Sequence, residues 1–258
     1  MMRKTIMFAA VAALLFVSGL ASAQVSERWI TGRWDADWVG HPDGPGHDPA
    51  VFLYRRTFDL GTKPDKFVIH VSADQRYRLF VNGVSVANGP ARGDLFHWRY
   101  ETVDIAPQLK SGKNVLAAVV WSMGVMAPWA QHTAHNAFIV QGDAPENWIV
   151  NTPGDWKVAR DEGWGFTPRP TFQKGGHVTG PNELVIAEKH PWGWNLPDFD
   201  DSKWVRPISI ANGVPSGMWG DGSSLWQLMP RPIPMLEETP ERLVSIVRTK
   251  KAQVSPEF

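Results

Sequence analysis

The central part of the chain has the short-period alternation of apolar and polar residues that is typical of β-strands with one buried face. The pattern first appears at 51–60. After a turn, residues 67–72 form a run dense in β-forming residues. A third strand at 77–81 leads into Asn82-Gly83, and a fourth follows at 84–86. Because both turn residues tolerate positive φ, this pair predicts a hairpin with a tight type I′ turn.

The same pattern predicts further strands at 100–105, 115–121 and 137–141. The run at 115–121 is apolar throughout, which is typical of a central strand buried on both faces. The later half of the chain is looser, with short strand candidates at 156–159, 184–187 and 205–208. Strands about 10 to 15 residues apart, with turns between them and no helical period, predict an all-β sandwich or jelly roll.

The first residues have a different pattern, that of a secretory signal. Arg3 and Lys4 precede an apolar run from Ile6 to Val17, and Ala21-Ser22-Ala23 has the small-x-small pattern of a cleavage site. We expect a signal peptide at 1–23, cleaved after Ala23, and therefore a secreted or periplasmic protein. The alternative is a membrane anchor, but the apolar run is shorter than the ~20 residues that a spanning helix needs.

A proline-rich stretch, Pro230–Pro234, predicts a stiff spacer because proline cannot donate ladder hydrogen bonds. We therefore expect a β-sandwich domain at 24–229 and, at 230–258, a linker and the start of a truncated following element. That short extra C-terminal element reads as a strand at 243–247 or as a helix capped by Thr239. The strand is favoured because the segment is rich in β-branched residues.

The composition narrows the possible chemistry. The chain has no cysteine, which excludes thiol nucleophiles and Cys-ligated metals. Its formal net charge is +0 and it has no run of Lys or Arg, which argues against a nucleic acid partner. After the first 23 residues, no segment approaches ~18 continuous apolar residues, so we expect no membrane span. The 14 Trp residues suit either a sandwich core or a sugar-binding face.

Several stretches together resemble the N-terminal region of bacterial α-L-rhamnosidases, glycoside hydrolase family 78. They include 52–58, Ser72–Gly83, Gly89–Asp94, His97–Glu101, Asp198–Trp204 and Leu228–Pro234, and the resemblance runs from about Trp34 to Glu238. It implies a galactose-binding-like jelly-roll sandwich. In such enzymes the catalytic acid and base lie in a helical barrel that follows the sandwiches. This sequence lacks that barrel, so the resemblance implies an accessory module without catalytic residues.

Tryptophans in loop-like sequence are the best binding signal, because a Trp ring can stack on a sugar. We take Trp129, Trp192 and Trp194, together with His132, as carbohydrate-binding candidates. The alternative is that these rings plug the end of the sandwich or contact a missing domain, and the resemblance favours this alternative. The His132 and His135 pair lacks a third ligand nearby, so we do not expect zinc.

Three acidic residues, Asp198, Asp200 and Asp201, lie within four positions. Neighbouring Asp residues usually form turns by bonding their own backbone. A structural Ca²⁺ is the second hypothesis, since hard cations take clustered carboxylates, and catalysis is the least favoured. The tripeptide Arg92-Gly93-Asp94 reads as a turn with a local ion pair.

These observations lead to competing functions. The first is a non-catalytic accessory module that supports a separate or missing catalytic domain in the hydrolysis of plant or bacterial rhamnose-containing glycans. It predicts an exposed aromatic patch where that domain would pack. The second is a free-standing carbohydrate-binding module. The third, an autonomous hydrolase, requires a pair of carboxyl groups facing one another across the sugar.

Overall fold

The computed structural model describes residues 26–167, 180–218 and 224–239, with single positions at 241, 242, 245 and 248. The predicted signal peptide at 1–23 lies outside the described residues, as does most of the strand or helix expected at 243–247. Within the described part of the chain, no helix is long and apolar enough to cross a membrane.

The larger sheet has seven strands. Their spatial order is β12 (Ile208–Asn212), β1 (Asp37–Gly40), β8 (Ala137–Gly142), β3 (Val68–Asp74), β6 (Trp98–Asp104), β14 (Gln227–Pro230) and β13 (Val214–Pro215). Neighbours pair antiparallel from β12 to β6. The last two strands, β14 and β13, join in parallel beyond β6.

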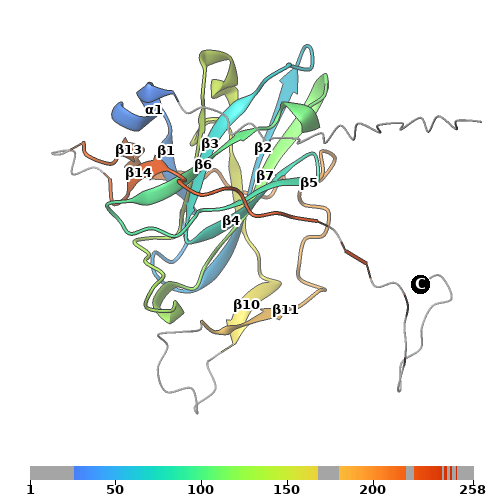
Figure 1. Cartoon of the computed structure of the whole chain (residues 1–258). Helices are drawn as coiled ribbons and strands as arrows, with labels where there is room; N and C mark the ends of the chain where they lie inside the picture. Colours follow the sequence, from blue (N-terminus) through green and yellow to red (C-terminus); the bar gives the residue numbers. More distant parts are fainter. Residues whose placement is uncertain are drawn as a thin grey trace, which may run out of the picture.

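The second sheet has five antiparallel strands. Their order is β5 (Val84–Gly89), β4 (Arg76–Val81), β7 (Gly112–Ser122), β2 (Ala50–Leu60) and β9 (Lys157–Arg160). A separate hairpin, β10 (Trp164–Thr167) with β11 (Asn182–Val185), lies at the lower edge of the view in Figure 1. The helical elements are short: α1 (Glu27–Thr31) and the 3-10 turns η1 (Ala106–Gln108), η2 (Gly124–Met126) and η3 (Pro145–Val150).

The all-β sandwich predicted from the sequence is confirmed. Each predicted strand between 51 and 141 overlaps an observed one, and β7 is the central strand of its sheet. The candidate at 205–208 is shifted, because β12 begins only at Ile208, while Val205 makes an isolated bridge to Val158. Pro207 lacks the N–H that a continuous ladder needs. Strands β1, β10, β13 and β14 and helix α1 have no counterpart among the elements predicted from the sequence.

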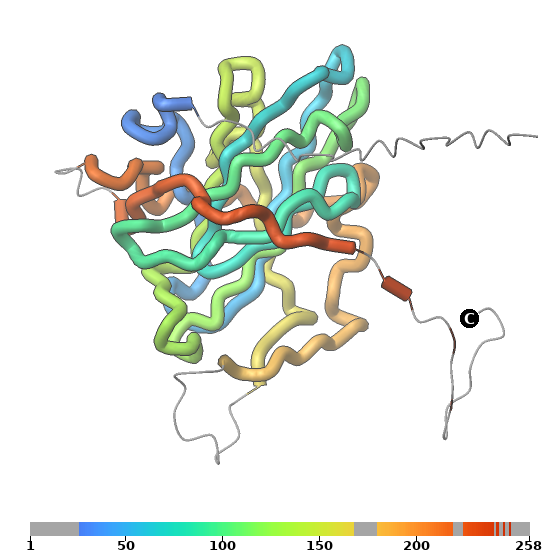
Figure 2. Tube along the Cα trace, viewed as in Figure 1, coloured from blue at the N-terminus to red at the C-terminus, as the bar shows by residue number. Residues whose placement is uncertain are grey.

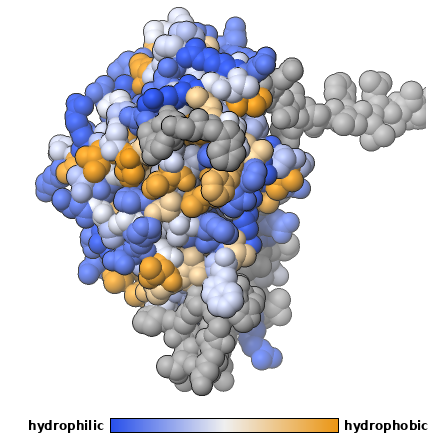
Figure 3. All heavy atoms as spheres, turned by 90° about the vertical axis from the view of Figure 1, so that its left-hand side faces the viewer, coloured by the Kyte–Doolittle hydropathy of each residue, from blue (hydrophilic) through white to orange (hydrophobic). Residues whose placement is uncertain are grey.

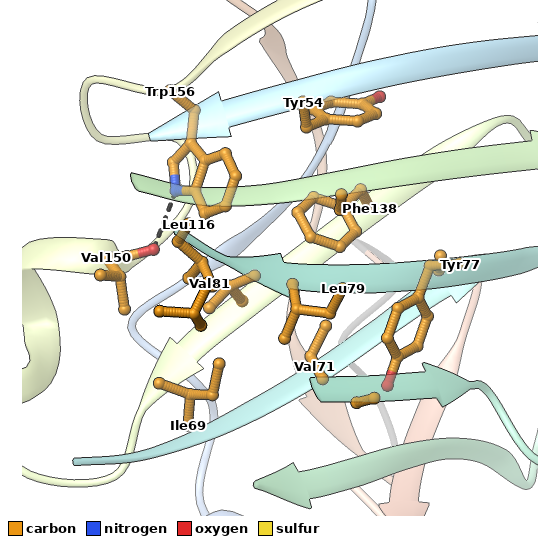
Figure 4. Close-up of a cluster of buried hydrophobic side chains, with 14 of the residues drawn as sticks. Tyr54, Ile69, Val71, Tyr77, Leu79, Val81, Leu116, Phe138, Val150 and Trp156 are labelled. Atoms are coloured by element: carbon orange, nitrogen blue, oxygen red, sulfur yellow. Dashed lines mark hydrogen bonds between the residues drawn. The ribbon is translucent and has the colours of Figure 1, made fainter. Parts of the chain in front are cut away.

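The main core fills the space between the two sheets (Figure 4). Phe138 of β8 packs against Tyr54 of β2, with ring centroids 5.0 Å apart, and against Trp156, at 5.4 Å. All three side chains are essentially inaccessible to solvent. The Trp156 indole donates to the carbonyl of Val150 at 2.8 Å, so its polar edge is satisfied inside the core.

The outer face of each sheet carries a further cluster of buried residues. Against the seven-stranded sheet, Trp38 stacks on Trp226 with centroids 4.4 Å apart. Against the five-stranded sheet, Val51 and Leu53 pack with Trp194. Strands covered on both faces need apolar residues at every position, which explains the unbroken apolar run in β7. The solvent-facing surface on the side that carries α1 has separate apolar patches among hydrophilic residues (Figure 3).

The predicted Asn-Gly turn joins β4 to β5. Asn82 has φ of 51° and Gly83 has φ of 88°, as a type I′ turn requires. The Asn82 amide also donates to the Gln108 carbonyl and to Asn114 Oδ1, both at 2.9 Å. Its oxygen accepts from the Val115 amide at 3.0 Å. The turn residue therefore ties the hairpin to the start of β7.

The chain after β14 lies along the sandwich (Figure 2). Arg231 N donates to the Tyr100 carbonyl at 2.9 Å, and Ser85 donates to Glu238 at 3.3 Å. The first residues of the expected linker therefore contact β5 and β6. The division into a domain at 24–229 and a separate segment at 230–258 stays a prediction.

Candidate functional site

A groove of about 450 Å³ opens where β4, β5 and the loops after β5 and η2 meet the chain after β14. We call it the cationic groove, because four arginines line it and no Asp or Glu does. Its lining residues are Gln75, Arg76, Tyr77, Arg78, Asn88, Gly89, Pro90, Ala91, Arg92, Gly93, Trp98, Trp121, Gln131, His132, Arg231 and Leu236.

Strand alternation places two of the arginines. Along β4, Tyr77 and Leu79 are buried in the main core, whereas Arg76 and Arg78 are exposed. Arg92 reaches the groove from the loop after β5 and is also exposed. The fourth, Arg231, follows β14 and has a side chain only 8% exposed.

Below the groove, Glu101 of β6 is fully buried and balances the charge of Arg231. Its carboxylate accepts hydrogen bonds from Tyr77 Oη at 2.7 Å, from the Ala91 amide at 2.8 Å and from Arg231 Nη1 at 3.1 Å. Burial raises the pKa of Glu101, and these three donors oppose that effect. Burial, and next the charge of Glu101, raise the pKa of the Tyr77 hydroxyl well above its usual value. Arg231 is therefore a structural cation.

Arg76 and Arg92 lack this kind of compensation. Arg76 Nη2 donates to the neutral Gln131 Oε1 at 3.2 Å. Arg92 has no hydrogen-bond or ion-pair partner among the residues that the structure describes. Although part of Arg76 is exposed, its partial burial and next the charge of Arg92 lower the pKa of its guanidinium. The local ion pair expected within Arg92-Gly93-Asp94 is not formed by Arg92, since Asp94 instead lies 3.0 Å from His97 Nδ1.

Aromatic side chains form another part of the groove lining. Trp121, at the end of β7, is half-buried and stacks on Trp164 with centroids 6.3 Å apart and planes 18° apart. Trp98 is only 4% exposed. Trp98 Nε1 and Gln75 Nε2 are buried donors without an acceptor in the described part of the chain. The groove lining therefore combines cationic and aromatic side chains, with no carboxylate among them.

Of the predicted carbohydrate-binding residues, His132 lines the groove and is exposed. Trp129 lies in the same loop, between η2 and β8, and is 79% exposed, but it is not part of the groove lining. The other two candidates lie in the loop after β11. The structure thus places His132 in the groove with the arginines, whereas the predicted binding tryptophans Trp129, Trp192 and Trp194 lie outside the groove lining.

Trp192 and Trp194 differ strongly in exposure. Trp192 is 68% exposed, donates to the Ala187 carbonyl at 2.8 Å and contacts the His190 ring edge-on. Trp194 is 6% exposed and packs edge-on against Phe80 over the five-stranded sheet. Trp192 is therefore the accessible ring of the pair.

The three acidic candidates point to different partners. Asp198 is exposed and lies 3.7 Å from Lys113. Asp200 accepts from the Ser202 amide at 2.9 Å, the local bond of an Asx turn. Asp201 pairs with Arg55 at 2.9 Å and with Lys157 at 2.7 Å. Among the described residues, no group of three or more His, Asp or Glu is placed to hold a metal ion. The calcium hypothesis stays a prediction.

Hydrolysis of a glycosidic bond in the cationic groove would need carboxyl groups that its lining does not contain. The carboxylate of Glu101, beneath the groove, is inaccessible to solvent and is bonded to Arg231 and Tyr77. The groove can offer hydrogen-bond donors, positive charge and aromatic surface. Such groups can hold an anionic or hydroxyl-rich ligand.

A second surface feature is an aliphatic strip on the β10–β11 hairpin. Leu184, Val185 and Ile186 are 48%, 54% and 37% exposed, and they follow one another in the chain. The accessory hypothesis expected an exposed aromatic patch. On β11 the exposed residues are the polar Asn182 and Glu183 and the aliphatic Leu184 and Val185, and the exposed aromatic rings Trp129 and Trp192 lie in other loops.

Sequence comparison relates the chain to part of larger enzymes. It is 26% identical over 219 residues to an α-L-rhamnosidase of Streptomyces avermitilis, covering 78% of this chain and 18% of that protein. It is 24% identical over 196 residues to an α-L-rhamnosidase of Alteromonas sp., covering 69% and 21%. No family model matches the chain.

Structural comparison also relates the chain to part of an α-L-rhamnosidase. The glycoside hydrolase family 78 rhamnosidase of Bacillus sp. GL1 superposes with a TM-score of 0.67 and 27% identity, over 79% of this chain and 20% of that structure. The chain therefore spans about a fifth of the length of the relatives that it matches.

Proposed function

We propose that this chain, a homologue of one segment of the family 78 α-L-rhamnosidases, is a non-catalytic accessory module of an α-L-rhamnosidase-like glycoside hydrolase. In this proposal it supports a separate catalytic domain that hydrolyses rhamnose-containing glycans. One observation carries the proposal: the lining of the cationic groove contains four arginines and no acidic residue.

Two features support a role beside another domain. The relatives are about five times as long as the region that they share with this chain. The aliphatic strip Leu184–Ile186 exposes apolar area on an outlying hairpin, where contact with another domain would remove it from water.

A free-standing carbohydrate-binding module is the second candidate. The observation that favours it is the exposure of the Trp129 and Trp192 rings, at 79% and 68%. Such rings stack on pyranose faces, which are apolar. Under this alternative, Trp192→Ala and Trp129→Ala weaken binding of L-rhamnose, whereas Trp194→Phe, at a buried ring, leaves binding unchanged.

The test of the proposed function is an assay of the purified full chain with p-nitrophenyl α-L-rhamnoside, with a complete family 78 enzyme as positive control. We expect no release of p-nitrophenol above the buffer rate, because no acid pair lines the groove. Turnover that co-purifies with the chain through successive chromatography steps would refute the non-catalytic role. A parallel fluorescence titration with L-rhamnose examines the second candidate.

A further inference from the structure

The charges around the cationic groove do not cancel. Arg231 is matched by the buried Glu101. Arg78 donates to the neutral Asn88 at 2.9 Å and lies 3.9 Å from Glu238, so it is partly matched. Arg76 and Arg92 have no acidic partner among the described residues, although they are close enough for the charge of Arg92 to lower the pKa of Arg76.

Two like charges held together without an anion are unfavourable in the free protein. An anionic group bound between Arg76 and Arg92 would relieve this repulsion. The planar guanidinium of arginine matches the two oxygens of a carboxylate in a bidentate arrangement. The groove is thus preorganised for a small anion with several acceptor oxygens.

The neutral groups of the groove favour the same kind of ligand. Gln131, whose oxygen already accepts from Arg76, has its amide N–H groups left to donate. A ligand that supplies acceptor oxygens would pair with these Gln131 N–H groups.

The volume of the groove and its aromatic lining favour a sugar that bears the anionic group. A volume of about 450 Å³ falls in the ~300–1,000 Å³ range of small-molecule sites. Trp121 lines the groove, and an indole presents the flat apolar surface on which a pyranose ring packs. An extended polyanion fits less well, because the chain as a whole has net charge +0.

We propose that the cationic groove binds a carboxylate-bearing sugar, a uronate residue of an oligosaccharide, with its carboxylate between Arg76 and Arg92 and its ring against Trp121. This inference rests on the proposed accessory role in glycan hydrolysis and adds a ligand class to it. His132 and Gln131, which also line the groove, would contact the sugar hydroxyls.

The test compares D-galacturonate with D-galactose, which differ in the carboxylate, by titration of the full chain followed through tryptophan fluorescence. We expect D-galacturonate to bind about tenfold more tightly or better, the effect of one charged hydrogen-bonded contact. Higher ionic strength should weaken binding of D-galacturonate only. The double variant Arg76→Gln/Arg92→Gln should abolish the difference between the two sugars.

The matched control is Arg206→Gln, which removes an arginine that is 76% exposed and lies outside the groove lining. It should bind both sugars as the unaltered chain does. A thermal melt checks folding of the double variant, whose two side chains are exposed, so its midpoint should not fall. A fall in that midpoint would mean that the arginines serve the fold instead.

Three results would overturn this inference: equal affinity for the two sugars, no binding of either, or acetate binding as tightly as D-galacturonate. The last would indicate a site for any small carboxylate. None of them depends on turnover of p-nitrophenyl α-L-rhamnoside, so this inference and the non-catalytic role can fail separately.

Discussion

At the scale of single residues, the buried charge of Arg55 fixes a loop through hydrogen bonds and an ion pair. Arg55 has a side chain 1% exposed, yet it lies in the apolar layer over the five-stranded sheet. It donates to the carbonyls of Trp194 and Leu196 and pairs with Asp201, and its guanidinium lies 5.3 Å from the centre of the Phe199 ring. One strand residue thereby holds the loop 194–201 against β2. An unpaired charge at this depth would be strongly destabilising, so the loop and the arginine depend on one another.

Asp201→Asn should lower the free energy of unfolding at pH 7 by about 1.5 to 3 kcal/mol, the range for hydrogen bonds to charged groups. Burial opposes the charged form of Asp201, but the hydrogen bonds from Lys157 and Arg55 hold its pKa below the usual value. Its contribution is therefore present above the unfolded pKa of ~3.9 and lost as the pH falls through the lower native pKa.

Urea unfolding at pH 7 and in steps towards pH 3 measures this effect. The deficit of Asp201→Asn should shrink as the pH falls, because the unaltered protein loses the same interaction. Asp198→Asn, at an exposed side chain 3.7 Å from Lys113, is the control and should change stability little. A deficit that stays constant with pH would show that the charge of Asp201 is not what stabilises the loop.

At the scale of elements, the β4–β5 hairpin was predicted from its sequence down to the turn residues, because its signal is local. Asn82 and Gly83 supply the positive φ angles that the turn needs. What the sequence did not indicate is the second use of Asn82, whose side chain bonds to Gln108, Asn114 and Val115. These partners are more than 25 residues away, so only the folded arrangement brings them together.

Two substitutions at Asn82 separate the contribution of its positive φ angle from that of its side-chain hydrogen bonds. Asn82→Gly keeps the backbone angle and loses the side-chain hydrogen bonds, so we expect a loss of about 2 kcal/mol in unfolding free energy. Asn82→Ala should cost about 1 kcal/mol more, because a side chain with a Cβ is strained at positive φ. Denaturant unfolding measures both. Equal stability of Asn82→Gly and the unaltered chain would contradict a stabilising role for the amide.

At the scale of the whole molecule, three apolar clusters are stacked through two sheets. β8 joins two of them, because Phe138 faces the core between the sheets while Ile139 faces the outer layer of the seven-stranded sheet. β2 links the inner core to the other outer layer through Phe52 and Leu53. Since β8 and β2 each contribute side chains to two clusters, loss of packing in one cluster should also disrupt the neighbouring cluster.

We therefore expect one cooperative unfolding transition. Phe138→Ala should lower the free energy of unfolding by about 3 to 5 kcal/mol, and Ile139→Ala should lower it by about 2 to 5 kcal/mol. Both variants should still unfold in a single transition. Tryptophan fluorescence and far-UV circular dichroism should report coincident curves for each variant. Ile208→Ala, at a side chain 49% exposed on the edge strand β12, is the control and should stay within about 0.5 kcal/mol. Separated transitions for the two core variants would mean that the layers unfold independently.

The candidate site was much less predictable than the fold. Of the four carbohydrate-binding candidates, only His132 lines the cationic groove. Arg76 and Arg92 went unrecognised as a pair because they are 16 positions apart, and Arg92 was assigned a local partner in Asp94. The alternation of Arg76 and Arg78 along β4 was a usable signal for two cations on one face.

By itself the sequence determined the sandwich class, the central position of β7 and the Asn82-Gly83 turn, because these follow from local periodicity and backbone preference. The tertiary structure alone decided which tryptophans are covered and which arginines gather without an acid. Trp192 and Trp194 are two residues apart and chemically identical, yet one is 68% exposed and the other 6%. Burial and charge balance depend on partners that are distant in the chain, and only the packing of the sheets and their loops sets those distances.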